Sequence, residues 1–504
     1  MKKYLHTIRW YIVGSLILYI LEVIFTSCIL FFPGYMIDHY IEGKKFVVNL
    51  IFIYILTFSF YLLICYFSNR IADYRRIRFE KKLKQDFFNS VIKKTYTDYY
   101  KHDIGEYLSM QSSDITELCQ NYLSPLLSVF RSTIMIMAFG LALVIFVDVS
   151  IAAVIMIFSF LVVFVPGITA KRLSENNNKY LSSLGKYTSK IKTFLDAHDI
   201  LDIQAKEKII EIHEKELDTV LKNNMSFRKV NSLAMVVNGG AVEFVSVISF
   251  IVITMLLLNN KISVGMATVA FTYSTKFMDP IYELNVNIGK VNSVKEIKAK
   301  LYRIINDNSE ITMSDSLAVK CIEVRGLKKQ FEEVRLEYPD MDLKFPEKYL
   351  LLGKNGVGKS VFLRMLMGYY KPDEGKILID GREEVGRSHF FCYVPQQPVI
   401  FDASYNDNVT IFGTYDNENL VLYESFFPDD LVERIKMNFD NKTLSGGEKQ
   451  VIGLLRALCS GKQVLLLDEP FASMNPAAIN KFMENLNDIQ RLVIIVAHNI
   501  DNYK

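Results

Sequence analysis

The feature that most constrains this chain is a set of long apolar stretches in its N-terminal part. A helix that crosses a membrane needs about 20 consecutive, predominantly apolar residues. Stretches of this kind occupy residues 11–36, 46–67, 126–147, 151–168, 233–258 and 264–284. We therefore predict six transmembrane helices within residues 1–310, forming an all-α membrane domain. The first stretch is too long for the apolar core of a cleavable signal peptide, which has about 7–15 residues.

The distribution of basic residues predicts the orientation of these helices. Lys2, Lys3 and Arg9 precede the first stretch, and lysines and arginines crowd residues 70–101. Because positive charge near the ends of membrane spans favours the cytoplasmic side, we expect both termini to be cytoplasmic. We expect the same of the two long loops between the stretches, residues 68–125 and 169–232. The chain is then a multi-pass protein of the cell membrane. The absence of a strong net charge, +3 overall, argues against a nucleic-acid partner.

The C-terminal part of the chain has a different pattern. Beyond residue 300, short apolar runs at 349–352, 464–467 and 492–496 alternate with helical segments. Such runs are typical of a buried parallel sheet. We expect an α/β domain over residues 318–504, with a boundary near residues 307–317. Half of all residues are hydrophobic although 22% are charged, which agrees with one membrane domain joined to one water-soluble domain.

The predicted α/β domain contains a phosphate-binding loop. Residues 353–360 read GKNGVGKS and match G-x-x-x-x-G-K-[ST] between a strand and a helix. The helix N-terminus and Lys359 favour phosphate, and the Ser360 hydroxyl can bind Mg²⁺. The residues expected to contact the nucleotide are Gly353, Lys354, Asn355, Gly356, Val357, Gly358, Lys359, Ser360 and Val361.

Two more motifs follow the loop. Residues 464–470 read VLLLDEP, an apolar strand that ends in two carboxylates. Asp468 suits the Mg²⁺ shell, and Glu469 suits the role of general base toward the attacking water. Residues 444–448 read LSGGE, where Ser445, Gly446 and Gly447 open a helix and form a second anion-binding site. One nucleotide hardly needs two such sites from the same chain.

These motifs, in this order after six spans, resemble those of ATP-binding cassette (ABC) half-transporters of the exporter type. The resemblance implies a P-loop nucleotide-binding domain that hydrolyses ATP with Mg²⁺. It implies a dimer with an identical or related half-transporter, in which each nucleotide lies between one P-loop and the partner's LSGGE motif. It also implies that Gln396 senses Mg²⁺ and water, that His498 contacts the γ-phosphate, and that Phe331 stacks on adenine, with Tyr338 as a competitor.

The chain also departs from the family's pattern. Asn475 stands where an aspartate is usual, so we expect altered communication between the two cassettes. Only six residues follow His498, and we expect a cassette that is short at its C-terminus. The resemblance places two helices that couple the domains near residues 98–103 and 195–201.

The substrate is the least determined part of the prediction. Charged residues inside membrane spans are costly and often functional, and Glu22 and Glu243 lie within the first and fifth spans. One hypothesis is that they attract a cationic group in an apolar cavity. The alternative is that they pair with Arg131, Lys276 or the backbone. We expect export of a hydrophobic or amphipathic peptide, drug or lipid, whereas the rival function is a non-transporting, regulatory ATP-binding subunit of a heterodimer.

Overall fold

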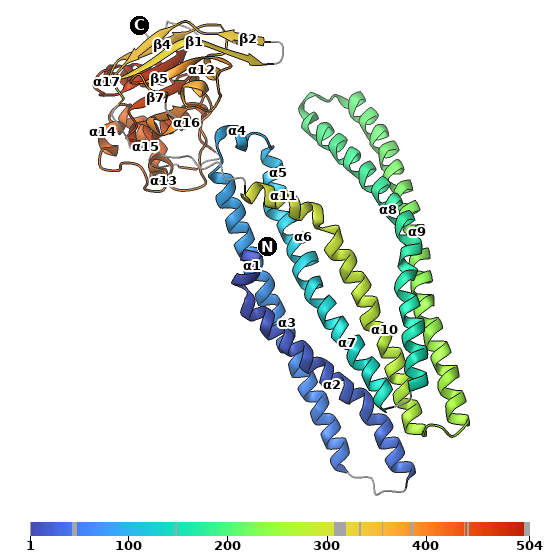
Figure 1. The fold of residues 1–504 in the computed structure, drawn as a ribbon. Coiled ribbons are helices and arrows are strands. Elements are labelled where there is room, and N and C mark those ends of the chain that lie inside the picture. Colours follow the sequence, from blue (N-terminus) through green and yellow to red (C-terminus); the bar gives the residue numbers. More distant parts are fainter. Residues whose placement is uncertain are drawn as a thin grey trace. The chain divides into compact units, whose positions relative to one another are not determined.

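The computed structural model describes residues 2–42, 48–146, 149–306, 319–331, 334–354, 356–383, 387–437, 439–440 and 443–497. The chain forms two compact units, Met1–Asn89 with Ile104–Asn306, and Ser90–Asp103 with Asp307–Lys504. The first unit is helical and the second is α/β (Figure 1). This confirms the predicted fold class. The predicted boundary at residues 307–317 lies outside the described residues.

The helical unit consists mainly of long helices. Its elements are α1 (Lys2–Thr7), α2 (Arg9–Ile41), α3 (Val48–Ile92), α5 (Ile104–Ser109), the π-helix η1 (Met110–Asp114), α6 (Ile115–Leu118), the π-helix η2 (Cys119–Leu123), α7 (Ser124–Phe146), α8 (Val149–Asp196), the 3-10 turn η3 (His198–Ile200), α9 (Ile203–Leu258), α10 (Val264–Ser293) and α11 (Lys295–Asn306). The described parts of the six predicted apolar stretches fall on α2, α3, α7, α8, α9 and α10, whereas residues 46, 47 and 147 lie outside the described residues. Their number as membrane spans stays a prediction.

Length and composition single out part of this unit as membrane-crossing. Among the described residues, four helical segments are long and apolar enough to span a bilayer: Arg9–Ile41, Asn49–Ile92, Ile104–Ile145 and Ile203–Leu258. Within the most apolar window of the second segment, no residue is buried inside the protein. Apolar side chains that face outward along a whole helix fit lipid rather than water.

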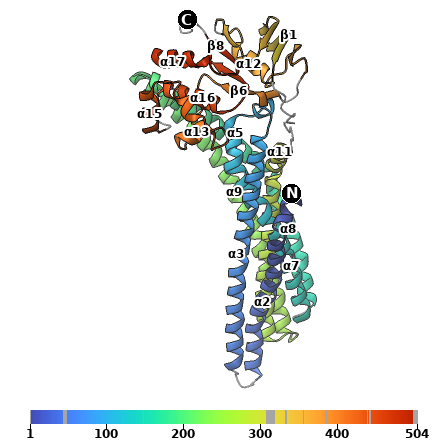
Figure 2. The same cartoon turned by 90° about the vertical axis from the view of Figure 1, so that its left-hand side faces the viewer.

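The helices pack around a core of their own. α7 and α2 pack against α10, and α8 runs side by side with α9 (Figures 1 and 2). Phe139 and Leu143 of α7 are fully buried against Tyr273 and Phe277 of α10. These contacts give the unit an internal core even though much of its outer surface is apolar.

The second unit combines a parallel sheet with an antiparallel one. Its elements are α4 (Tyr96–Tyr99), β1 (Cys321–Phe331), β2 (Val334–Glu337), β3 (Met341–Lys344), β4 (Lys348–Leu352), α12 (Lys359–Leu366), β5 (Glu374–Ile379), the 3-10 turn η4 (Arg387–Phe390), β6 (Phe391–Val394), α13 (Tyr405–Thr410), α14 (Leu420–Glu424), α15 (Asp429–Met437), α16 (Gly446–Cys459), β7 (Val464–Asp468), α17 (Pro476–Leu486) and β8 (Leu492–Ala497). The parallel sheet has the order β4-β8-β7-β6, and β1 pairs antiparallel with β2, β3 and β5. The predicted parallel sheet is therefore confirmed, and β7 and β8 are buried as expected. The run at 349–352 is a correction: β4 lies at the edge of the sheet, and its Leu350 and Leu352 are 38% and 40% exposed.

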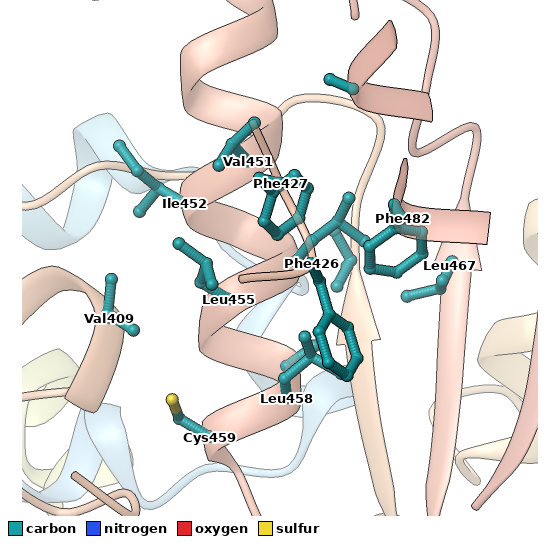
Figure 3. Close-up of a cluster of buried hydrophobic side chains, with 14 of the residues drawn as sticks. Val409, Phe426, Phe427, Val451, Ile452, Leu455, Leu458, Cys459, Leu467 and Phe482 are labelled. Carbon is teal, nitrogen blue, oxygen red and sulfur yellow. The ribbon is translucent and has the colours of Figure 1, made fainter. Parts of the chain in front are cut away.

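Two hydrophobic clusters cover the opposite faces of this parallel sheet. In β7, Leu465 and Leu467 join the cluster around α16, whereas Val464 and Leu466 join the cluster around α12. Successive strand residues point to opposite faces, so both faces of β7 need apolar side chains. Figure 3 shows the first cluster, in which Phe427 and Phe482 lie beside α16 and Leu467. This burial explains why the strand is continuously apolar.

The two short helical segments expected in the loops are present at slightly different positions. α4 covers residues 96–99, a little before the expected 98–103, and packs as part of the α/β unit. It begins where the Thr95 side chain accepts a hydrogen bond from the Asp98 backbone N–H. η3 covers residues 198–200, within the expected 195–201.

Candidate functional site

The predicted phosphate-binding, metal-binding and catalytic residues of the α/β unit follow strands of its parallel sheet. The phosphate-binding loop follows β4, Gln396 follows β6, and Asp468 and Glu469 stand at the end of β7. The carboxyl ends of parallel strands meet at one edge, which is where open α/β sheets bind ligands. His498 directly follows β8 in sequence, but it lies outside the described residues.

The backbone of the loop has a shape that requires glycine. Gly356 and Gly358 have φ of 82° and 92°, in the left-handed region that other residues rarely adopt. A Cβ on Gly358 would lie 2.6 Å from the Tyr338 hydroxyl and 2.7 Å from a Leu336 methyl group. The loop therefore follows its neighbours too closely for a side chain. Asn355 lies outside the described residues.

Lys359 holds the loop in a conformation suited to an anion. Its ammonium group donates to the carbonyls of Gly353 and Lys354 at 2.5 and 3.1 Å. The side chain is buried, and the first turn of α12 contains no acidic residue. The helix N-terminus and this ammonium group thus create a positive environment. Ser360 and Val361 occupy the next two positions of the same helix.

The two carboxylates after β7 have different partners. Asp468 is buried and accepts a hydrogen bond from the Tyr393 hydroxyl at 2.9 Å. Burial, followed by the Asp468 charge, raises the pKa of Tyr393 far above its usual range, so the phenol keeps its proton. Glu469 accepts a hydrogen bond from the Gln396 amide at 2.9 Å. Sequence reasoning did not identify Tyr393, because its contact joins two strands that are distant in the chain.

The donor groups fit Mg²⁺ only if a nucleotide supplies oxygens as well. Asp468, Ser360 and Gln396 offer the oxygen ligands that this ion prefers. No group of three or more His, Cys, Asp or Glu residues that could hold a metal occurs among the described residues. Mg²⁺ commonly binds one or two protein groups together with substrate phosphates, so the site is compatible with MgATP.

The LSGGE motif forms a regular helix start. The Ser445 hydroxyl accepts a hydrogen bond from the Glu448 N–H, and the Glu448 carboxylate accepts one from the Ser445 N–H. Burial raises the pKa of Glu448, but the hydrogen bonds from Ser445 and Arg434 outweigh it and hold the pKa below its usual range. A Cβ on Gly447 would lie 2.5 Å from the Ser473 carbonyl oxygen, whereas Gly446 has slightly more room.

Asn475, the departure from the family's pattern, has a structural role in this chain. Its side-chain oxygen accepts a hydrogen bond from the Ala478 N–H at 2.7 Å and caps α17, with Pro476 at the first helical position. Asn and Asp cap helices about equally well. The exchange therefore removes a charge without removing the cap.

The two aromatic candidates for adenine stacking differ in their surroundings. Tyr338 donates to the Gly358 carbonyl at 2.9 Å and packs on Phe362. Phe331, at the end of β1, is 37% exposed and contacts Tyr370 edge to face. Phe331 is therefore the more accessible of the two rings, although Lys329 Nζ lies over it at 5.7 Å from its centroid. Its role stays a prediction.

An aromatic contact joins α4 to the helix that follows the phosphate-binding loop. The rings of Tyr96 and Tyr369 stack with centroids 4.3 Å apart, and Tyr370 meets Tyr96 edge to face. Arg364 of α12 lies over the Tyr96 ring. Tyr370 also contacts Phe331. Sequence reasoning expected a coupling helix nearby but not these tyrosines, since periodicity does not identify a partner ring.

In the helical unit, the charged residues inside the predicted spans form an ion cluster. The Arg131 guanidinium donates to Glu22 at 3.2 Å and to Glu283 at 3.0 Å. Glu22 is buried and Glu243 is exposed. The structure thus contains the Arg131 pair that was the alternative for Glu22. The Glu283 partner was missed, although it lies inside the last apolar stretch. Roles of Glu22 and Glu243 in a substrate path stay predictions.

Comparison with known proteins gives consistent matches along the chain. The family model for the ABC transporter transmembrane region matches residues 12–281, and the ABC transporter model matches residues 336–472. A putative export ATP-binding/permease protein of Rickettsia felis is 23% identical over 477 residues, covering 87% of this chain and 79% of that protein.

Two further matches differ in how much they cover. The lactococcin-A transport/processing ATP-binding protein of Lactococcus lactis is 26% identical over 269 residues; the match covers 49% of this chain and 37% of that protein's length. The solved structure of a bacterial Atm1-family ABC exporter with ATP bound has a TM-score of 0.83 at 16% identity. The match covers 98% of this chain and 91% of the exporter chain, and it shows a similar fold.

Proposed function

This chain belongs to the ABC transporter family, and from that premise we propose that it is an ATPase half-transporter that drives export of a hydrophobic or amphipathic molecule. The observation that carries the proposal is the single sheet edge that combines the phosphate-binding loop, Asp468 and the Gln396–Glu469 contact. The proposal also includes the dimer, since the LSGGE motif would serve the nucleotide of a second half-transporter.

The residues at this edge divide the work of hydrolysis. Lys359 and the backbone N–H groups around Gly356 and Gly358 would bind the phosphates, with the Lys359 ammonium leaving its two carbonyl partners. Mg²⁺, when bound through Ser360, Asp468 and Gln396, supplies charge neutralisation on the phosphates. Glu469 would accept the proton of the attacking water.

Hydrogen bonds from neighbouring side chains position these groups. The Tyr393 hydroxyl keeps the Asp468 carboxylate oriented, and the Gln396 amide holds Glu469 at the edge of the sheet. His498 would contact the γ-phosphate, and Phe331 would stack on adenine. The roles of His498 and Phe331 rest on the family's pattern and on the position of each residue at the end of a strand.

Transmission to the membrane helices would pass through α4. Arg364 lies on the helix that begins at the phosphate-binding loop, and it covers the ring of Tyr96 in α4. A shift of α12 on nucleotide binding would therefore move a ring that belongs to the chain segment between α3 and α5. Closure of two cassettes and their reopening after hydrolysis would alternate the access of the transport path.

The test is ATP hydrolysis by the purified full-length protein alone in lipid nanodiscs. We expect turnover that falls about 10²–10⁴-fold in Glu469→Gln, the effect of losing a general base. Glu484→Gln, at an exposed position of α17, is the matched control and should stay within twofold. Phosphate release measures both.

The same preparation separates the rival function. Activity that appears only after a related second subunit is added would favour an ATP-binding subunit of a heterodimer. Equal turnover in the wild type and Glu469→Gln would remove the assignment of the general base. Transport of substrate into proteoliposomes would then be measured for the form that hydrolyses ATP.

A further inference from the structure

A polar cavity lies in the helical unit between α2, α3, α7 and α10. Its volume is about 380 Å³. Three cations line it, Arg75, Arg131 and Lys290, whereas Glu283 is the only carboxylate among the described lining residues. The other polar groups of the wall are neutral hydroxyls and amides. The wall therefore has an excess of positive charge that no residue of the cavity balances.

Arg75 is the least compensated of these cations. Its side chain is 1% exposed, Nη1 donates to the Ser15 hydroxyl, and Nε has no hydrogen-bond partner among the residues that the structure describes. No carboxylate forms an ion pair with Arg75 within the part of the chain that the structure describes. Buried arginines are normally paired, because an unpaired buried charge is costly. A ligand with negative charge would supply the missing partner.

Arg131 is shared between its two acids and the cavity. Glu22 and Glu283 accept hydrogen bonds from its terminal nitrogens, while its Nε also lacks a hydrogen-bond partner in the described part of the chain. Because Glu22 already pairs with Arg131, its carboxylate is a poor attractor for a cationic substrate. The net positive charge around Arg75 favours an anionic ligand instead.

An apolar cavity adjoins the polar one. It has a volume of about 200 Å³, and it shares the wall residues Tyr282 and Val286 with the cavity of Arg75. Val162, Val242 and Ile281 contribute to its lining. A molecule that occupies both cavities must carry a charged end and an apolar end.

We propose that the Arg75 cavity binds a carboxylate or phosphate group of an amphipathic anion, whose apolar part enters the neighbouring cavity. The inference rests on the proposed function, because it names the substrate class of that transporter. Guanidinium groups bind carboxylate and phosphate through paired N–H donors. The anion is the headgroup of a membrane lipid or belongs to a soluble amphiphile, and both carry the same chemistry.

The test measures binding of a matched pair of probes, dansyl-aspartate and the neutral dansyl-asparagine amide. The full-length protein is held in phosphatidylcholine nanodiscs without nucleotide, and fluorescence anisotropy reports binding. We expect the anionic probe to bind more tightly. Arg75→Gln should weaken its binding about 10–100-fold, the usual effect of losing charge-assisted hydrogen bonds.

Two further variants keep the test decisive if Arg75→Gln does not fold. Lys290→Glu changes an exposed lysine of the same wall and should weaken the anionic probe several-fold. Lys261→Gln is the matched control, since Lys261 is exposed and is not among the described lining residues of the Arg75 cavity or of its apolar neighbour, and it should stay within twofold. Equal affinity for both probes, or no effect of Arg75→Gln and Lys290→Glu, would overturn the proposal.

Lipid competition reports the source of the anion, and ATP turnover separately reports whether the protein is an active ATPase. Competition by phosphatidylglycerol in the nanodisc that disappears in Lys290→Glu would assign a lipid headgroup, and lack of competition would assign a soluble anion. Binding without ATP turnover, both alone and with a related second subunit, would refute the proposed transporter but not the anion site. ATP turnover that depends on Glu469, without preference for the anionic probe, would refute only the anion site.

Discussion

The two units of this protein use the same apolar residue types against opposite surroundings. In β7 and β8 of the α/β unit, every residue is buried. In the most apolar window of α3, none is buried inside the protein. Leu, Ile, Val and Phe thus indicate a core strand in one unit and a lipid-facing helix in the other. The length of the apolar run distinguishes them, because a strand needs about 4–8 residues and a membrane span about 20.

The comparison also separates two uses of charge. In the α/β unit, Lys359 donates to backbone carbonyls, Asp468 accepts from a phenol and Glu469 accepts from an amide. In the helical unit, Arg131 is held between two acids, while Arg75 has no acidic partner among the described residues. Charge in the first unit is arranged for a nucleotide, and charge in the second is partly neutralised inside the bundle.

The largest expected effect comes from removing a core side chain. Leu466→Ala in β7 should lower the opening free energy of the surrounding backbone by about 2–5 kcal/mol, because Leu466 is fully buried and a cavity remains. Leu56→Ala in α3, at a side chain 45% exposed, should change it by less than about 0.5 kcal/mol. Hydrogen exchange of the full chain in nanodiscs measures both.

Equal effects of Leu466→Ala and Leu56→Ala on the opening free energy would contradict the difference between the two units. Similar losses in β7 and α3 would mean that Leu56 packs against protein rather than lipid. The control is Val493→Ala in β8, which should resemble Leu466→Ala in direction because Val493 is also fully buried.

A smaller effect is expected from two Gly→Ala substitutions. Gly447→Ala should cost about 1–3 kcal/mol and reduce ATP turnover about tenfold or more, because its Cβ would lie 2.5 Å from the Ser473 carbonyl oxygen. A Cβ at Gly185 in α8 would meet no atom of the described residues within 4 Å, so Gly185→Ala should stabilise its helix by up to about 1 kcal/mol. Phosphate release and hydrogen exchange report the two effects. A harmless Gly447→Ala would show that the helix start tolerates a shift.

The smallest effect concerns pH and the capping box of α16. The folded-state pKa of Glu448 lies below its usual value, so its carboxylate stabilises the helix start above about pH 4.3. That contribution is lost as the pH falls through the lowered pKa. Glu448→Gln should flatten the pH dependence of exchange at the first turn of α16 between pH 6 and pH 3.5. An unchanged pH profile would assign the dependence to another carboxylate.

Much of the fold and of the nucleotide site could be predicted from local patterns. The strand containing Leu466, the glycines of the phosphate-binding loop and the position of Asp468 each follow from short runs of residues. Their physical causes, burial, positive φ and strand ends, act within a few residues. The Tyr393 contact with Asp468 and the Tyr96 stack on Tyr369 escaped prediction, because each joins segments far apart in the chain.

By itself, the sequence determined the length and period of the apolar runs, and therefore predicted which helices suit a membrane and which runs form the parallel sheet. It also predicted the phosphate-binding loop, since the glycines, Lys359 and Ser360 of the motif lie within a few residues of one another. Only the tertiary structure decided the charge partners: Arg131 with Glu22 and Glu283, and Arg75 without an acid among the described residues. Periodicity specifies a face of a helix, whereas a partner depends on the register and packing of several helices.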